Sequence, residues 1–171
     1  MQSRLISSVA AMAIGLTLAA TLAGTASAQT ATPAQTAASK KALADTHKDI
    51  QATLGVLPGF FLAYPEEGLP GAWAAFKQVQ VAENTRISPK MKQLIGLAVS
   101  AQVPCSYCVY FHTQVAKAYG ATPEEIKEAV ALAAISRHWS TVLNGMAIDM
   151  TSFRSEVDTS LRVAAERAAK K

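Results

Sequence analysis

Cysteine is scarce in this chain of 171 residues, and its two copies, Cys105 and Cys108, stand in one short motif. A structural zinc site usually takes four ligands, so two thiols are too few to form one unaided. We therefore expect no metal site and no cofactor. The alternative is a zinc site in which His112, with His138 or His47, completes the ligand set.

Concentrated positive charge is also lacking. The chain carries 16 basic and 12 acidic residues, its lysines are scattered, and no basic cluster exceeds a pair such as the terminal Lys170-Lys171. Because nucleic-acid binding needs a concentrated basic face, we expect no nucleic-acid partner.

A second long apolar run is absent. The one that exists, at 5–23, follows Arg4 and precedes the sequence ASA at 26–28, which is the small-x-small pattern of a signal-peptide cleavage site. We predict that residues 1–28 are a signal peptide. A transmembrane anchor is the alternative, but no positive residue follows the run to stop its transfer.

Export has consequences for compartment and charge. The segment holds no Arg-Arg pair, which favours the general secretory route over the twin-arginine route. Removing Arg4 leaves 15 basic residues against 12 acidic ones, a net charge of +3. We expect a periplasmic or secreted protein without stable membrane association, in a compartment where paired cysteines usually form a disulfide.

Runs of alternating β-branched residues, the pattern of a β-strand, are missing. The chain is therefore predicted to be all-α: a flexible linker at 29–38, then a single helical domain at 39–171 with six or seven helices. The helices are expected at about 39–54, 71–83, 89–102, 105–119, 123–136, 138–152 and 155–171.

Local signals set several of these bounds. Ser88 followed by Pro89 is a strong helix start, and Thr122 with Glu125 forms a capping box. Gly55 and Gly120 are expected to end helices. In the helix over 89–102 we expect these side chains to be buried: Leu94, Ile95, Leu97, Ala98 and Val99.

The segment CSYCVYFH at 105–112 carries the chemistry that the sequence predicts. Positions i, i+3 and i+7 share one helix face, so Cys105, Cys108 and His112 line up. Two cysteines three apart on a helix lie within disulfide range. Cys105 stands near a helix N-terminus, which favours a thiolate, and His112 has a pKa suited to accepting a thiol proton.

A purely structural disulfide is the main alternative for this pair. The loop that it closes is four residues long, so the chain-entropy model gives it roughly 2 kcal/mol, against roughly 3 kcal/mol for a loop of 15 residues. A disulfide between these cysteines would therefore stabilise the fold little, and a redox function for the pair is favoured. A thioredoxin domain is disfavoured because the segment before the motif, 91–102, is helical in pattern rather than a strand.

The stretch KQLIGLAVSAQVPCSYCVYFHTQVAKAYGATPEEIKEAVALAA, at 92–134, resembles the alkylhydroperoxidase D and carboxymuconolactone decarboxylase family. The resemblance extends over about 57–150, and its Cys-x-x-Cys-x-x-x-His motif is the specific part. It implies an alkylhydroperoxidase D-like helical bundle that assembles as a trimer or hexamer. It also implies that Cys108 attacks a hydroperoxide, that Cys105 resolves the product to a disulfide, and that His112 helps to deprotonate Cys108.

Two positions depart from the family's peroxidase pattern. A glutamate begins the family's proton relay twelve residues before the first cysteine, where this chain has Gln93. An amide can orient His112, but it cannot accept a proton. Tyr107 stands where the best-known peroxidases place a histidine between the cysteines. Both changes remove titratable groups, so a weaker peroxidase or a thiol–disulfide exchanger is expected.

The leading hypothesis is a thiol-dependent peroxidase that reduces hydroperoxides through a Cys105–Cys108 dithiol–disulfide cycle. Its partners would be a hydroperoxide substrate and a thiol reductant that the sequence does not identify. Three alternatives stay open: thiol–disulfide exchange, a lactone decarboxylase-type lyase, and a non-redox helical assembly protein with a structural disulfide.

Overall fold

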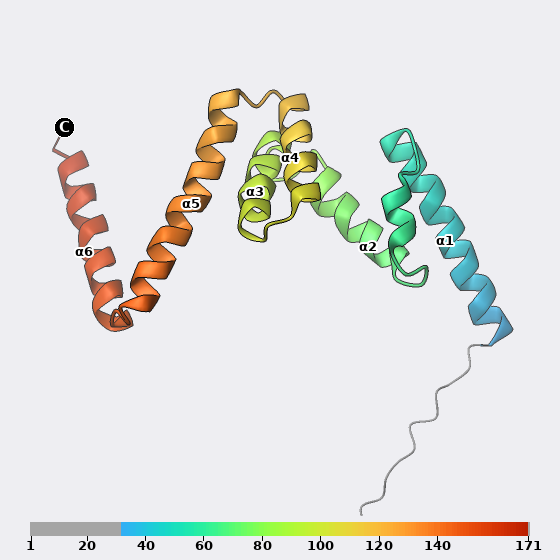
Figure 1. The fold of residues 1–171 in the computed structure, drawn as a ribbon, viewed down its shortest axis with the longest axis horizontal. Coiled ribbons are helices and arrows are strands. Elements are labelled where there is room, and N and C mark those ends of the chain that lie inside the picture. Colours follow the sequence, from blue (N-terminus) through green and yellow to red (C-terminus); the bar gives the residue numbers. More distant parts are fainter. Residues whose placement is uncertain (1–31, 171) are drawn as a thin grey trace, which may run out of the picture.

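Six α-helices, and no strand, are found in residues 32–170, the part of the chain that the computed structural model describes (Figure 1). The all-α prediction is therefore confirmed. The predicted signal peptide at 1–28 lies outside the described residues.

The first helix, α1, spans Pro33–Leu54 and starts earlier than expected. Its cap is Thr32, whose side chain accepts a hydrogen bond from the backbone of Gln35, while the Gln35 side chain accepts one from the backbone of Thr32. This capping box, with proline at the first helical position, is sufficient to begin the helix there. Residues 33–38 are therefore helical, and their assignment to a flexible linker was wrong. Gly55 ends the helix in the left-handed region at φ 81°.

A second unit forms where the chain turns back on α1. The segment between the first two helices contains a 3-10 helix, η1, at Gly59–Ala63, and α2 follows at Leu69–Phe76. A π-helical turn, η2, continues α2 over Lys77–Val81. The core between α1 and α2 consists of Ile50, Leu69 and Trp73, with Leu43, Leu57, Phe61 and Phe76 packed around them.

Helices α3, Pro89–Gln102, and α4, Ser106–Ala118, form the hairpin that carries the cysteine motif. The predicted bounds of α3 are confirmed, and Ser88 caps it by accepting a hydrogen bond from the backbone of Met91. Leu94 and Leu97 are buried as expected, whereas Ile95 and Val99 are 46% and 56% exposed. Those two lie on the side of α3 opposite its buried face, so their predicted burial is wrong for the single chain.

Helix α5 is one continuous element, Pro123–Gly145, and α6 follows at Met150–Ala168. The predicted capping box at Thr122 is present. The predicted break near residue 137 is wrong, because no glycine or proline interrupts the helix there. The chain turns only after Gly145, and Asp149 caps α6 by accepting a hydrogen bond from the backbone of Ser152.

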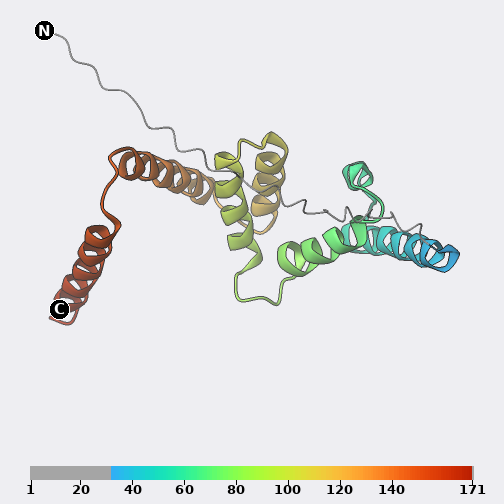
Figure 2. The same cartoon turned by 90° about the horizontal axis from the view of Figure 1, so that it is seen from below.

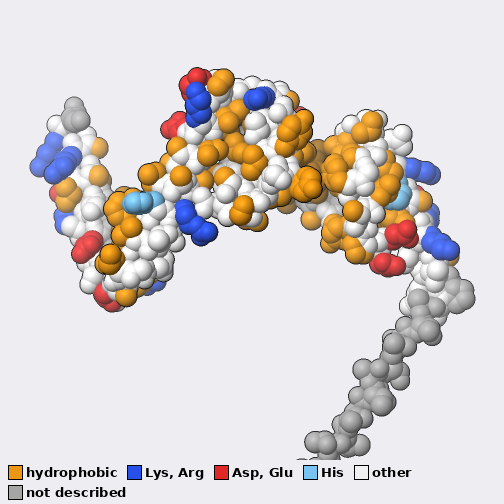
Figure 3. Space-filling model, in the orientation of Figure 1, with side chains coloured by type: hydrophobic (Ala, Val, Ile, Leu, Met, Phe, Trp, Pro, Cys, Tyr) orange, Lys and Arg blue, Asp and Glu red, His pale blue; other side chains and the backbone are white. Residues whose placement is uncertain are grey.

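The helices form an elongated arrangement rather than one closed bundle (Figures 1 and 2). The α1–α2 unit lies at one end, the α3–α4 hairpin lies in the middle with the first half of α5 beside it, and α6 lies at the far end. No residue of α6 is buried. Apolar side chains are spread over the visible face of the molecule (Figure 3).

None of the helices within 32–170 is both long enough and apolar enough to cross a membrane.

Candidate functional site

Cys105 and Cys108 are joined by a disulfide at the start of α4. Cys105 is the N-cap of the helix, where serine, threonine or aspartate would usually stand, and its Sγ accepts a hydrogen bond from the backbone N–H of Cys108 at 3.2 Å. Its own backbone N–H donates to the Ser100 carbonyl at 3.1 Å, which ties the motif to the end of α3. The sulfur of Cys105 therefore lies against the positive end of a helix, where a thiolate is stabilised.

His112 lies two turns further along α4 and reaches back to α3. Its Nδ1 is 2.9 Å from Oε1 of Gln93, a side chain that is only 2% exposed. An amide oxygen can only accept, so Nδ1 carries the proton and Nε2 is the nitrogen with a free lone pair. Gln93 thus has the geometry for the orienting role that the sequence predicts for it.

Burial lowers the pKa of His112 below its ordinary value of 6.5. Desolvation disfavours the charged imidazolium, and Gln93 brings no negative charge to compensate. The ring is therefore neutral at neutral pH and available as a base, but it is a weaker base than a histidine paired with a carboxylate.

Aromatic rings connect this site to α2. The ring of Phe111 packs edge-to-face on His112 with centroids 5.2 Å apart, and it lies 6.2 Å from the ring of Phe76 on α2. Phe76 in turn stacks on Trp73 at 5.8 Å. These contacts place an apolar wall beside the imidazole, consistent with its partial burial.

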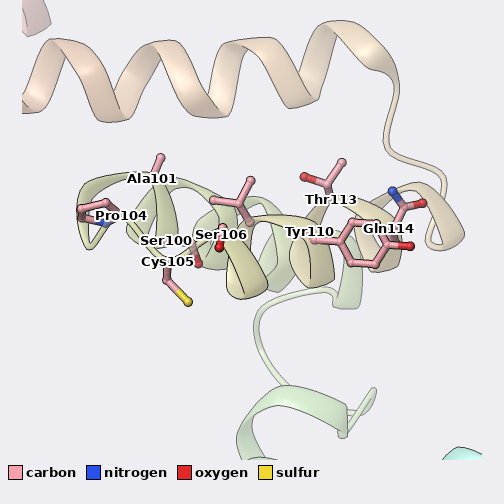
Figure 4. Close-up of a pocket in the computed structure, with 9 residues that line it drawn as sticks. Ser100, Ala101, Pro104, Cys105, Ser106, Tyr110, Thr113 and Gln114 are labelled. Carbon is pink, nitrogen blue, oxygen red and sulfur yellow. The ribbon is translucent and has the colours of Figure 1, made fainter. Parts of the chain in front are cut away.

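A shallow groove of about 560 Å³ runs beside the disulfide (Figure 4). Pro104 and Cys105 lie toward one end of it and Tyr110 with Gln114 toward the other. Cys105 is the cysteine of the pair that lines the groove. The groove lining consists of Ser100, Ala101, Pro104, Cys105, Ser106, Val109, Tyr110, Thr113 and Gln114.

Ser100 is a member of the site that the sequence reasoning missed. It is 5% exposed, its carbonyl holds the backbone of Cys105, and its hydroxyl donates to the Gly96 carbonyl at 2.6 Å. Its position seven residues after Gln93, on the same face of α3, is the signal that could have found it.

The other two histidines stand on separate helices: His47 on α1, and His138 on α5 with its ring against Trp139 at 5.6 Å. Across 32–170, no group of three or more histidine, cysteine, aspartate or glutamate side chains is arranged to hold a metal ion.

Comparison with known proteins gives three findings. The model of the carboxymuconolactone decarboxylase family matches residues 67–149. The crystal structure of the alkylhydroperoxidase AhpD core from Rhodospirillum rubrum superposes with a TM-score of 0.57 and 28% identity, covering 74% of this chain and 95% of that one. An uncharacterized protein of Cupriavidus necator is 35% identical over 65 residues, which are 37% of this chain and 58% of that protein.

The helical region around the cysteine pair thus has the fold of the alkylhydroperoxidase D core. Residues 67–149 match the carboxymuconolactone decarboxylase family, and an alkylhydroperoxidase D core is among the structural neighbours of the chain. The fold and the family resemblance predicted around the Cys-x-x-Cys-x-x-x-His motif are confirmed, and they support a function of the peroxidase or decarboxylase type.

Proposed function

We propose that this protein is a thiol-dependent peroxidase that reduces organic hydroperoxides with Cys105 and Cys108. The observation that carries the proposal is that the cysteine pair and a histidine base lie on the same helix. One cysteine caps α4 through its sulfur, and His112 follows on the same helix with a neutral imidazole oriented by Gln93. A decarboxylase that works without thiols has no need of such an arrangement.

The cycle balances with the groups present and one thiol reductant. His112 takes the proton of the Cys108 thiol at Nε2, and the thiolate attacks the hydroperoxide, whose O–O bond breaks. The imidazolium returns its proton to the departing alkoxide, which leaves as an alcohol. Cys108 becomes a sulfenic acid. The Cys105 thiolate, favoured at the helix cap, then attacks that sulfur, forming the disulfide and releasing water. Two thiols of an external reductant restore the pair by exchange.

Gln93 sets the strength of the base in this cycle. A carboxylate in its place would stabilise the imidazolium, whereas the amide only fixes which nitrogen carries the proton. The proposed peroxidase is accordingly a slow one at neutral pH. Thiol–disulfide exchange is the second candidate, favoured by the groove that opens beside Cys105 and by the absence of a carboxylate at position 93.

Assembly into a homo-oligomer, a trimer or hexamer, is part of the proposal. A helix gains most of its stability from packing an apolar face, yet α6 buries none of its residues in the single chain. Four exposed apolar side chains also follow one another at intervals of four residues along α3 and its C-cap: Met91, Ile95, Val99 and Val103. A second copy of the chain would cover such faces. Export to the periplasm or outside the cell, through residues 1–28, is proposed with it.

The experiment follows free thiols after one equivalent of cumene hydroperoxide is added to reduced protein. We expect two thiols to disappear faster than those of dithiothreitol at equal concentration, and Cys108→Ser to abolish the fast phase. In Cys105→Ser, we expect the single thiol to be lost without disulfide formation within the chain.

Two results would redirect the proposal. Thiol loss at the dithiothreitol rate would reject the peroxidase and leave exchange or a structural bridge. Turnover of a lactone substrate by a variant that lacks both cysteines would instead support the decarboxylase type of activity.

A further inference from the structure

Gly96 lies on α3 one turn after Gln93, on the side that faces α4. A Cβ placed on this glycine would stand 2.3 Å from Cε1 of His112, 2.5 Å from its Nδ1 and 2.7 Å from its Nε2. Those separations are shorter than any that real Cβ atoms show. The imidazole therefore occupies the space that a side chain at position 96 would fill.

The same ring is held at its edge by Gln93. The hydrogen bond from Nδ1 to Oε1 sets the rotation of the imidazole, and the bare backbone at Gly96 sets how closely the ring approaches α3. The two constraints come from adjacent turns of one helix, so a ring that moved off Gly96 would also leave Gln93. The Gly96 carbonyl is itself engaged by the Ser100 hydroxyl, which keeps this turn of α3 in place.

We propose that Gly96 is a positioning residue for His112: its missing side chain lets the imidazole lie against α3, bonded to Gln93 through Nδ1 with Nε2 left for a thiol proton. The structural half of this inference stands on the contacts alone. Its bearing on catalysis rests on the proposed function.

A glycine can also serve only to bring two helices close together. If Gly96 serves only to bring α3 and α4 together, replacing it has the same effect with or without the imidazole of His112. If Gly96 positions His112, the effect requires the ring to be present. A double-mutant cycle between positions 96 and 112 therefore separates them.

The test compares wild type with Gly96→Ala in the full chain. The ring should move out toward solvent, so the pKa of His112, followed by NMR, should rise toward 6.5. In a Cys105→Ser background, iodoacetamide alkylation of Cys108 at pH 7 should slow by about tenfold or more, since a lost general base costs about 10²–10⁴. Gly71→Ala on α2, where an added Cβ meets no heavy atom within 4 Å, is the matched control and should change neither readout.

The His112→Ala background completes the cycle. There, Gly96→Ala should leave the urea midpoint and the alkylation rate unchanged. If Gly96→Ala alone does not fold, recovery of the fold in the double variant gives the same answer. An unaltered His112 pKa in Gly96→Ala, or an equal loss of stability in both backgrounds, would overturn the inference. Peroxide reactivity enters neither readout, so a shifted pKa in a protein that leaves hydroperoxides intact would reject only the proposed function.

Discussion

Replacing Gln93 by glutamate tests how this site differs from a carboxylate-assisted one. The new carboxylate would stand where Oε1 now lies, 2.9 Å from Nδ1 of His112. Two unit charges about 4 Å apart attract by about 4 kcal/mol at an effective dielectric constant of about 20. Burying the carboxylate at a position that is 2% exposed opposes part of this gain. The net expectation is a rise in the pKa of His112, because the attraction exceeds the opposing cost.

The assay is a pH titration of the histidine C–H resonances by NMR in wild type and in Gln93→Glu. The chain holds three histidines, so His112→Asn assigns the signal that matters. A stronger base should take the Cys108 proton more readily, and the hydroperoxide reaction of Gln93→Glu should be faster than that of wild type at neutral pH. A His112 pKa that stays unchanged or falls would refute the electrostatic reasoning, and an unchanged rate with a raised pKa would remove the relay model from this protein.

Three further predictions concern stability and assembly. Leu97→Ala removes a side chain that is 1% exposed and should lower the free energy of unfolding, measured in urea, by about 2–5 kcal/mol. Thr141→Ala, on the exposed part of α5, should change it by no more than about 0.5 kcal/mol. Similar losses in the two variants would contradict the burial described. Because the pKa of folded His112 lies below 6.5, the unfolded chain binds the extra proton, so stability should fall as pH drops from 6.5 through the folded pKa, and His112→Asn should flatten that slope. Sedimentation should show an assembly that Ile95→Asp weakens, and a wild-type chain that sediments as a monomer would reject the proposed trimer or hexamer.

Much of the fold could be predicted because the residues at the helix ends determine where the helices begin and end. Ser88 with Pro89 and Thr122 with Glu125 begin helices for reasons contained in a few residues, and Gly55 ends one in the left-handed conformation. The early start of α1 had the same kind of signal, a threonine followed by proline and, three residues on, Gln35. The residues around this signal are small and polar, which is also the composition of a flexible linker.

Other features depend on tertiary contacts that a short window of sequence does not contain. The apolar residues of α3 surround more of the helix than α4 and α5 can cover, so Ile95 and Val99 carry the same pattern as Leu97 but remain exposed. Helix α5 continues past residue 137 because nothing there breaks it. The π-helical turn after Phe76 has no signal in its sequence that we recognise.

Some residues of the candidate site could likewise be predicted from the sequence, and others depend on tertiary contacts. Spacing on one helix was enough to align Cys105, Cys108 and His112, and the family resemblance pointed to Gln93. Gly96 and Ser100 were missed because their roles arise between α3 and α4, through a steric contact in one case and a carbonyl in the other. The catalytic roles of all these residues stay predictions until the variants are measured.

The most direct test of the central claim is to trap the sulfenic acid. Reduced Cys105→Ser protein, which lacks the resolving thiol, would receive one equivalent of cumene hydroperoxide in the presence of dimedone, and peptide mass spectrometry would locate the adduct. We predict an adduct on Cys108, formed at a rate that His112→Asn lowers. Cys108 that remains an unmodified thiol, or an adduct whose rate of formation His112→Asn leaves unchanged, would contradict the account.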